Sequence, residues 1–346
     1  MKSILSLRTI LAAALFLIYL PGLLLASPSD DRADDRAKSY FEEGIDLNKQ
    51  HRYNEALERF TQAVTLNIDN HKYHQALYMT YIALRRGLQG IQHYKELARQ
   101  HPTNAAVHYW LGRFYIETQD LEEAVKEFRE TTRLAPQDEH GFVSLGHISL
   151  RLGKEKEALE AYTQANKLSP KIAGVHAGMG NIHYRRKRFD QAQKEYETAL
   201  AIDPSLTETR YNLGVIYEKK GEIGKAVKQW QKLVEDDPNE SAAREKLARV
   251  YFLGERYLDA VREYTMLSQV RQSSPQVFFS LGEAQVLLAA NLDDPEERQQ
   301  LIAMAMESFQ RTLELDPKNT QARKYLDRLA SEKRAAGKTT QKESPQ

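Results

Sequence analysis

Apolar side chains recur at helical spacing along most of the chain, and residues 207–240 show the pattern plainly. The apolar or small residues of the first half share one helical face: Tyr211, Leu213, Gly214 and Tyr217. Gly221 then interrupts the pattern at a position that suits a left-handed turn residue. A second amphipathic run follows, with these inner residues: Ala226, Val227, Trp230, Leu233 and Val234. Pro238 ends that run, so the stretch predicts two short helices joined by a turn.

The same pattern returns at the interval that separates Gly180 from Gly214, which is 34 residues. The position of Gly214 is small in seven of eight copies: Gly44, Gly112, Gly146, Gly180, Gly214, Ala248 and Gly282, with Tyr78 as the exception. The small residue of the second helix also recurs: Ala56, Gly90, Ala124, Ala158, Ala192, Ala226 and Ala260. An aromatic residue stands four positions after it each time: Phe60, Tyr94, Phe128, Tyr162, Tyr196, Trp230 and Tyr264. A proline ends five copies: Pro102, Pro136, Pro170, Pro204 and Pro238.

This period and this order of residues resemble the tetratricopeptide repeat family. The resemblance covers residues 37–319 in eight units: 37–70, 71–104, 105–138, 139–172, 173–206, 207–240, 241–274 and 275–319. Ile68, Tyr78 and Gln272 depart from the residue types that the pattern favours at their positions. The resemblance implies an all-α fold, a right-handed superhelical solenoid of helix–turn–helix repeats in one continuous array.

The shared positions have a physical explanation. A lone helix pair of this size leaves one face bare and is marginal in water, so the copies are expected to stack. Small residues on both helices allow close approach, and the aromatic residue fills the gap between neighbouring units. On this interpretation Gly180→Leu overpacks its unit and costs roughly 1–3 kcal/mol.

Charge and composition exclude several classes of protein. The formal net charge is +1, and it is −1 without residues 1–26, which hold Lys2, Arg8 and no acidic residue. A nucleic-acid or anionic-membrane binder would show a strong basic excess. The chain has no cysteine, which rules out disulfides, thiolate metal sites and cysteine nucleophiles. It also lacks a glycine-rich phosphate loop after a strand, a nucleophile elbow and a His-Glu-x-x-His run, so we predict that it is not an enzyme and needs no cofactor.

The first 26 residues are typical of an export segment. Lys2 and Arg8 precede an apolar run, and Pro21 and Gly22 break it before Ala26. Cleavage after Ala26 would release a signal peptide, whereas retention would leave an anchor of borderline length. Either outcome places the repeats across the membrane. We therefore expect an exported protein that is periplasmic or secreted, and that is anchored to the inner membrane if the N-terminal segment is retained.

The segments around the repeats are assigned from composition. Residues 27–36 are polar and charged, which predicts a flexible linker. Unit eight carries an insertion around residues 291–300, where Asp294 and Pro295 indicate a new helix start and hence a longer second helix. Residues 320–336 predict an amphipathic capping helix, and residues 337–346 a disordered tail.

Histidines suggest a metal-binding alternative. They form two pairs, each spaced by two helical turns: His140 and His147, His176 and His183. No carboxylate or cysteine completes a recognisable metal-ligand spacing beside them, and the competing explanation is that they fill helix interfaces.

The family resemblance implies that the first helix of each unit lines a concave groove. Reading its groove positions gives a strip of amide, aromatic and cationic groups: Tyr109, Arg113, His147, Asn181, Arg185, Tyr211, Asn212, Lys246 and Arg249. Asn181, Asn212 and Lys246 also match in type the clamp that some family members use on acidic peptides, but Ala177 and Ala242 replace its lysines.

These features predict a non-catalytic scaffold that binds an extended segment of a partner protein and acts outside the cytoplasm in envelope assembly or export. A carbohydrate-binding or polysaccharide-export accessory protein is the alternative, since grooves with Tyr and Asn also suit sugars. A metal-binding protein that uses the paired histidines is the third hypothesis.

Overall fold

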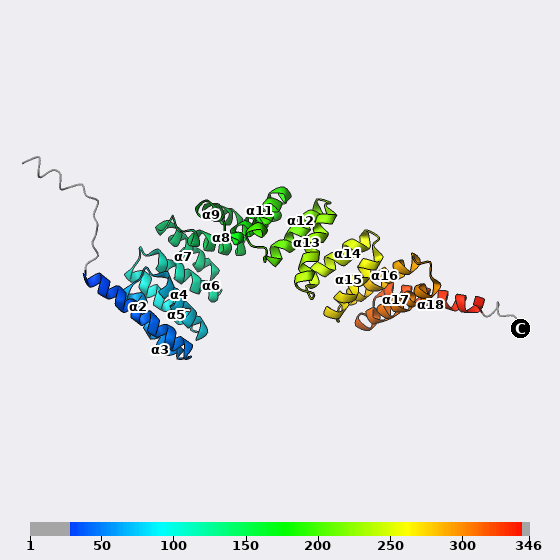
Figure 1. Ribbon diagram of the computed structural model, residues 1–346, viewed down its shortest axis with the longest axis horizontal. Coiled ribbons are helices and arrows are strands. Elements are labelled where there is room, and N and C mark those ends of the chain that lie inside the picture. The colour runs from blue at the N-terminus through cyan, green and yellow to red at the C-terminus, as the bar shows by residue number, and fades with distance from the viewer. Residues whose placement is uncertain (1–27, 341–346) are drawn as a thin grey trace, which may run out of the picture. The chain divides into compact units, whose positions relative to one another are not determined.

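The computed structural model describes residues 28–340, which form helices and turns without a strand (Figure 1). The described helices are α2 (Pro28–Lys49), α3 (Tyr53–Leu66), α4 (His71–Ala83), α5 (Gly87–Gln100), α6 (Ala105–Glu117), α7 (Leu121–Leu134), α8 (Glu139–Arg151), α9 (Glu155–Leu168), α10 (Ala173–Arg185), α11 (Phe189–Ile202), α12 (Thr207–Lys219), α13 (Ile223–Asp236), α14 (Ser241–Leu253), α15 (Tyr257–Val270), α16 (Pro275–Ala290), α17 (Pro295–Leu315) and α18 (Thr320–Thr340). The all-α repeat fold is therefore confirmed. The expected export segment, residues 1–26, lies outside the described residues.

Helix lengths repeat as regularly as the sequence does. From α4 to α15 each pair combines a first helix of 13 residues with a second of 14 residues. The turn between the two helices places one residue in the left-handed region in each of seven pairs: His51, Arg85, Gln119, Gly153, Lys187, Gly221 and Glu255. Gly221 has a φ of +75°, as its position in the sequence predicts. Since five of these seven residues carry a side chain, the turn geometry is set by the repeat and not by glycine alone.

Glycines on the first helices make room for the aromatic residues of the second helices. A Cβ at Gly180 would lie 2.5 Å from Cε1 of Tyr196, and a Cβ at Gly112 would lie 2.9 Å from Cε1 of Phe128. Tyr162 shows the same fit toward the next pair, because a Cβ at Gly178 would lie 2.5 Å from its Cζ. The recurring aromatic residues are thus buried within their own pair and against the following one, and a larger residue at the glycine would force the helices apart.

The second pair has a tyrosine, Tyr78, where the other pairs have a small residue. Tyr78 is buried and its ring packs against Phe114, with 4.9 Å between the centroids. Gly90 stands where the other second helices have alanine, and a Cβ there would lie 2.6 Å from Cζ of Phe114. The ring of Phe114 on α6 thus occupies the space over Gly90 on α5 and packs beside Tyr78 on α4.

The chain divides into two compact parts, one that ends at Lys154 and one that begins at Glu155. In the first part, each helix from α2 to α8 packs against the next one, and α4 also contacts α6. In the second part, consecutive helices pack from α9 to α18. The repeat expected over residues 139–172 thus has one helix in each part. The sequence period continues through this point without a change, so it could not indicate the division.

Both ends of the described chain are more helical than expected. Residues 28–36, predicted as a flexible linker, belong to α2, which begins at Pro28. Proline suits the first position of a helix, so the prediction of a linker from this polar composition was wrong. Residues 337–340, predicted as disordered, continue α18 through Gly337. None of the described helices has both the length and the apolar character needed to cross a membrane.

The insertion in unit eight lengthens both helices of its pair. The first, α16, has 16 residues and the second, α17, has 21. The side chain of Asp294 caps α17 by accepting hydrogen bonds from the backbone N–H groups of Glu296 (2.7 Å) and Glu297 (3.1 Å). Phe279, Phe309 and Tyr325 then join α16, α17 and α18 in one cluster of rings.

Candidate binding surface

A recess of about 490 Å³ lies across the first helices of three consecutive pairs. The N-terminal half of α4 contributes His71, Lys72 and Gln75, all exposed. The middle of α6 contributes Tyr109, Trp110 and Arg113, and the start of α8 contributes Asp138 and His140. The structure therefore brings together Tyr109, Arg113 and His140, three of the residues that the sequence singled out.

Arg113 is half-buried and lies over aromatic rings. Its guanidinium carbon is 5.1 Å from the ring centroid of Tyr78 and 5.6 Å from that of Trp110. Its Nη1 donates to the Tyr109 hydroxyl over 3.4 Å. Burial opposes the positive charge, but the tyrosine hydroxyls outweigh this effect and raise the pKa of Arg113 above its usual value. No carboxylate among the described residues forms an ion pair with this guanidinium.

The aromatic wall behind Arg113 is itself closely packed. Trp110 is 5% exposed, stacks on His74 at 6.5 Å with an interplanar angle of 12°, and meets Tyr109 edge-on at 5.4 Å. Its buried Nε1 makes no hydrogen bond within the described chain. The Tyr78 hydroxyl donates to Glu117 Oε1 at 2.5 Å, and burial together with this bond raises the pKa of Tyr78 to about 12. These contacts fix the rings against which the guanidinium rests.

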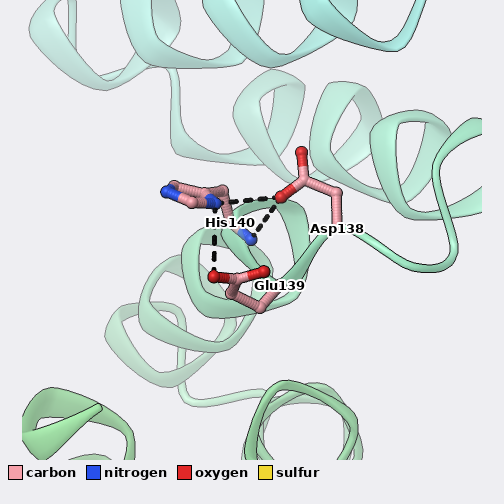
Figure 2. A group of neighbouring side chains, drawn as sticks. All are labelled: Asp138, Glu139 and His140. Atoms are coloured by element: carbon pink, nitrogen blue, oxygen red, sulfur yellow. Dashed lines mark hydrogen bonds and ion pairs between the residues drawn. The ribbon is translucent and has the colours of Figure 1, made fainter. Parts of the chain in front are cut away.

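At the far wall of the recess, Asp138, Glu139 and His140 form a compact group (Figure 2). Asp138 caps α8, because its Oδ1 accepts from the backbone N–H of His140 at 3.0 Å and contacts His140 Nδ1 at 2.9 Å. Glu139 Oε1 lies 3.8 Å from the same Nδ1. The three residues could present one ligand atom each to a cation, but helix capping accounts for the arrangement.

A second group of predicted residues lies on α10, α12 and α14, and its polar groups contact one another. Asn181 Oδ1 accepts from the Tyr196 hydroxyl at 2.6 Å and from Asn212 Nδ2 at 3.4 Å. The backbone carbonyl of Tyr211 accepts from Trp230 Nε1 at 3.3 Å, and burial raises the pKa of the Tyr211 hydroxyl. These amides are therefore already engaged inside the chain.

The cations of this second group are engaged as well. Glu218 accepts from Lys246 Nζ at 2.7 Å and from Arg249 Nη2 at 2.9 Å. Burial alone would raise the pKa of Glu218, but the hydrogen bonds and charges of Lys246 and Arg249 outweigh it and lower that pKa. Three groups that match the acidic-peptide clamp in type, Asn181, Asn212 and Lys246, thus have partners within the chain. Arg185 is exposed at the end of α10.

The remaining predicted histidines differ in their surroundings. His147 is exposed on α8. His176 is buried, with Nδ1 at 2.7 Å from Glu195 and Nε2 at 3.1 Å from the Pro170 carbonyl, so both of its ring nitrogens are occupied. His183 is partly buried, which lowers its pKa, and its Nδ1 makes no hydrogen bond within the described residues. His176 therefore belongs to the packing of its pair and does not offer a metal ligand.

His176 exemplifies a link that the sequence analysis missed. The fourth residue of five first helices contacts the carbonyl six residues upstream: His74 to Ile68, His108 to Pro102, His176 to Pro170, Arg210 to Pro204 and Arg244 to Pro238. Four of these residues also contact a Glu or Gln 19 residues downstream on the second helix: Glu127, Glu195, Gln229 and Glu263. The recurrence of histidine or arginine at this repeat position was the sequence signal that could have indicated the link. The recess residues Lys72, Gln75 and Trp110 were also missed, although they occupy groove positions of their units.

Family comparisons agree with this architecture. One family model described as TPR repeat matches residues 180–221, and three described as tetratricopeptide repeat match residues 81–142, 140–172 and 211–269. The four matches lie within residues 81–269, and the repeats in that region are therefore similar to tetratricopeptide repeats. No curated protein matches the chain.

Solved structures with the same fold include two that resemble the chain at TM-scores above 0.5. The C-terminal part of a TPR repeat-containing protein from Cytophaga hutchinsonii is 20% identical, covers 74% of this chain and 99% of its own, and has a TM-score of 0.57. PilF of Pseudomonas aeruginosa is 18% identical, covers 63% of this chain and 99% of its own, and has a TM-score of 0.53. At these identities the likeness shows the fold alone.

Proposed function

We propose that this protein is a non-catalytic scaffold that holds an extended segment of a partner protein along the first helices of its repeats. The tetratricopeptide fold is typical of protein–protein interaction, which supports the class. The observation that carries the proposal is the recess on α4, α6 and α8, because it joins three repeats and offers aromatic, amide and cationic groups on one surface. A bound segment would gain many modest contacts there, with the rings as its anchors.

Site-specific photocrosslinking tests this proposal. A photoreactive residue at Gln75, which is exposed in the recess, should capture a partner protein in intact cells, whereas one at the exposed Lys126 on α7 should not. Arg113→Glu should abolish capture from Gln75 in a chain that stays folded by circular dichroism. Capture from Lys126 alone would place the working surface on the second helices. Capture of glycan in place of protein would favour the carbohydrate-binding alternative.

We further propose that the scaffold acts outside the cytoplasm, in envelope assembly or export. The proposal rests on the positive and apolar pattern of residues 1–26. Protease added to cells with an opened outer envelope should digest the repeats, while a cytoplasmic marker survives. N-terminal sequencing of the purified protein separates the two variants of the proposal, because cleavage would leave Ser27 first and an anchor would keep Met1 or Lys2. Repeats that remain protected in such cells would contradict export.

A further inference from the structure

We propose that Arg113 binds the carboxylate of an aspartate or glutamate side chain within the partner segment. This inference rests on the proposed function and specifies its recognition chemistry. The recess on α4, α6 and α8 would then select acidic segments at this one point, while its aromatic and amide groups contact the rest of the segment.

The charge of Arg113 is not neutralised within the described chain. A guanidinium that is half removed from water needs a counter-charge or a full set of acceptors. Arg113 has a long hydrogen bond to a neutral hydroxyl, and no described carboxylate pairs with it. Glu117 stands one turn further along α6, but its carboxylate accepts from the Tyr78 hydroxyl. The guanidinium therefore has donors free for an incoming acid.

The equivalent position in the second part of the chain shows what is missing. Arg249 lies four repeats after Arg113 at the same repeat position, and Glu218, 31 residues before it, neutralises it at 2.9 Å. The residue 31 positions before Arg113 is Ile82. An isoleucine thus replaces the acid that would satisfy Arg113 from within the chain, and the partner must supply one.

The rings prepare Arg113 for a carboxylate. The guanidinium carbon of Arg113 lies 5.1 Å from the ring centroid of Tyr78 and 5.6 Å from that of Trp110, so the rings hold the charge in place while no acid within the described chain uses its N–H groups. Lys72, exposed at the same recess, adds a second positive charge, and Asp138 is held by His140. A single carboxylate fits this charge balance, whereas a nucleic acid backbone would need a longer basic surface than this chain of nearly zero net charge provides.

Matched peptides test the inference. Peptides of about ten residues, long enough to cross the three helices, carry one central Glu in an uncharged, terminally blocked sequence rich in Tyr and Asn, and each has a Gln twin. A Trp230→Phe chain leaves Trp110 as its single tryptophan, so its fluorescence reports the recess. We expect Glu peptides to bind about tenfold more tightly than their Gln twins, since a charge-assisted bond is gained.

Three variants separate recognition from folding. Arg113→Gln should remove the preference for Glu, and Arg249→Gln, the matched arginine that Glu218 already neutralises, should leave it intact. Ile82→Glu should also remove the preference while it keeps Arg113 on its rings, because it recreates the internal pair. If the Arg113→Gln chain does not fold, Arg113→Lys is the second variant. It keeps the positive charge but loses the paired N–H donors of the guanidinium, so it should weaken the preference several-fold.

The outcomes distinguish the two proposals. Equal binding of Glu and Gln peptides by the wild-type chain would overturn the carboxylate inference and leave the scaffold function standing. A preference that survives both Arg113→Gln and Ile82→Glu would also overturn it. Peptides that fail to bind while Gln75 still crosslinks a partner in cells would show that this partner lacks an acidic extended segment, which again rejects the inference alone.

Discussion

The recess on α4, α6 and α8 and the second group of polar residues on α10, α12 and α14, called the strip from here on, satisfy the same repeat positions in different ways. Trp110 and Arg113 correspond to Lys246 and Arg249, four repeats later. In the strip, Glu218 binds both cations, whereas in the recess Ile82 takes the place of Glu218 and the arginine rests on rings. The comparison teaches that a repeat position which lines a surface is not by itself a binding residue. What decides its use is whether the preceding repeat already satisfies it.

Acid should destabilise the recess more than the strip. Burial lowers the pKa of His74 to about 4 from the usual 6.5, so the unfolded chain binds more protons between these values and stability is lost as pH falls from 6.5 toward 4. The loss should reach roughly 3 kcal/mol. The equivalent residue in the strip is Arg210, so the strip has no histidine at this position. Urea unfolding at pH 7 and pH 4.5 should show the shift for Trp110 fluorescence in Trp230→Phe and a smaller one for Trp230 in Trp110→Phe.

His74→Gln provides the control for that experiment. It should lower stability at pH 7, because the contacts of His74 with Tyr94 and with the Ile68 carbonyl, both at 2.7 Å, are disturbed. It should also flatten the difference in Trp110 unfolding between the two pH values. A His74→Gln chain with the full acid sensitivity of the wild type would exclude His74 as the cause.

Gly180→Leu should disrupt the packing that supports the strip. The added side chain collides with Tyr196, whose hydroxyl donates to Asn181, and the helices α10 and α11 must separate. We expect a cost of about 2 kcal/mol, seen in urea unfolding followed through Trp230, with a smaller change at Trp110. An unchanged midpoint for both tryptophans would contradict the packing of glycine against the aromatic residue. Gly224→Leu, at a glycine with open space around it, is the matched control.

Glu218→Gln should make the strip resemble the recess. The change removes the shared partner of Lys246 and Arg249 and should cost about 1 kcal/mol, since the pairs are partly exposed. It should also give the strip a preference for Glu peptides over Gln twins, read from Trp230 in a Trp110→Phe, Arg113→Gln background. Glu222→Gln removes pairs with Lys220 and Lys225 away from the strip and should produce neither effect. A strip that stays indifferent to peptide charge would show that freeing these cations is not sufficient for recognition.

Gly221→Ala should have the smallest effect. The residue has a φ of +75° and nothing within contact distance of an added Cβ, so backbone strain alone should cost about 1 kcal/mol. Lys187→Ala, at the equivalent turn with a φ of +58°, should stay within about 0.5 kcal/mol because the strain is already present. Urea midpoints for the two variants measure the difference. Equal losses would mean that the side chain at residue 187, and not the turn, contributes to stability.

The repeat architecture could be predicted from the sequence because its signals are local and periodic. Gly180 and Tyr196 lie in one helix pair, and their sizes recur with the period, so packing follows from pattern. The neutralisation of Arg249 by Glu218 could not be predicted in this way, since it depends on which side chains of successive repeats meet in space. Neither could the helical start at Pro28, where a charged composition suits a linker and a helix equally. Tyr109 and Arg113 were predicted to line the groove. The recess around them could not be predicted, because it depends on which side chains of α4, α6 and α8 lie next to one another.

The link from the fourth residue of five first helices bears on the order in which the repeats fold. Its two arms span six residues to the upstream carbonyl and 19 residues to the second helix, as in His108 with Pro102 and Glu127. Contacts of such short range form early and need no distant part of the chain. A repeat with both arms can therefore close as soon as its own second helix is free to fold, and it then offers a surface on which the next repeat packs. This order shortens the time for which a folded repeat exposes an unpaired apolar face.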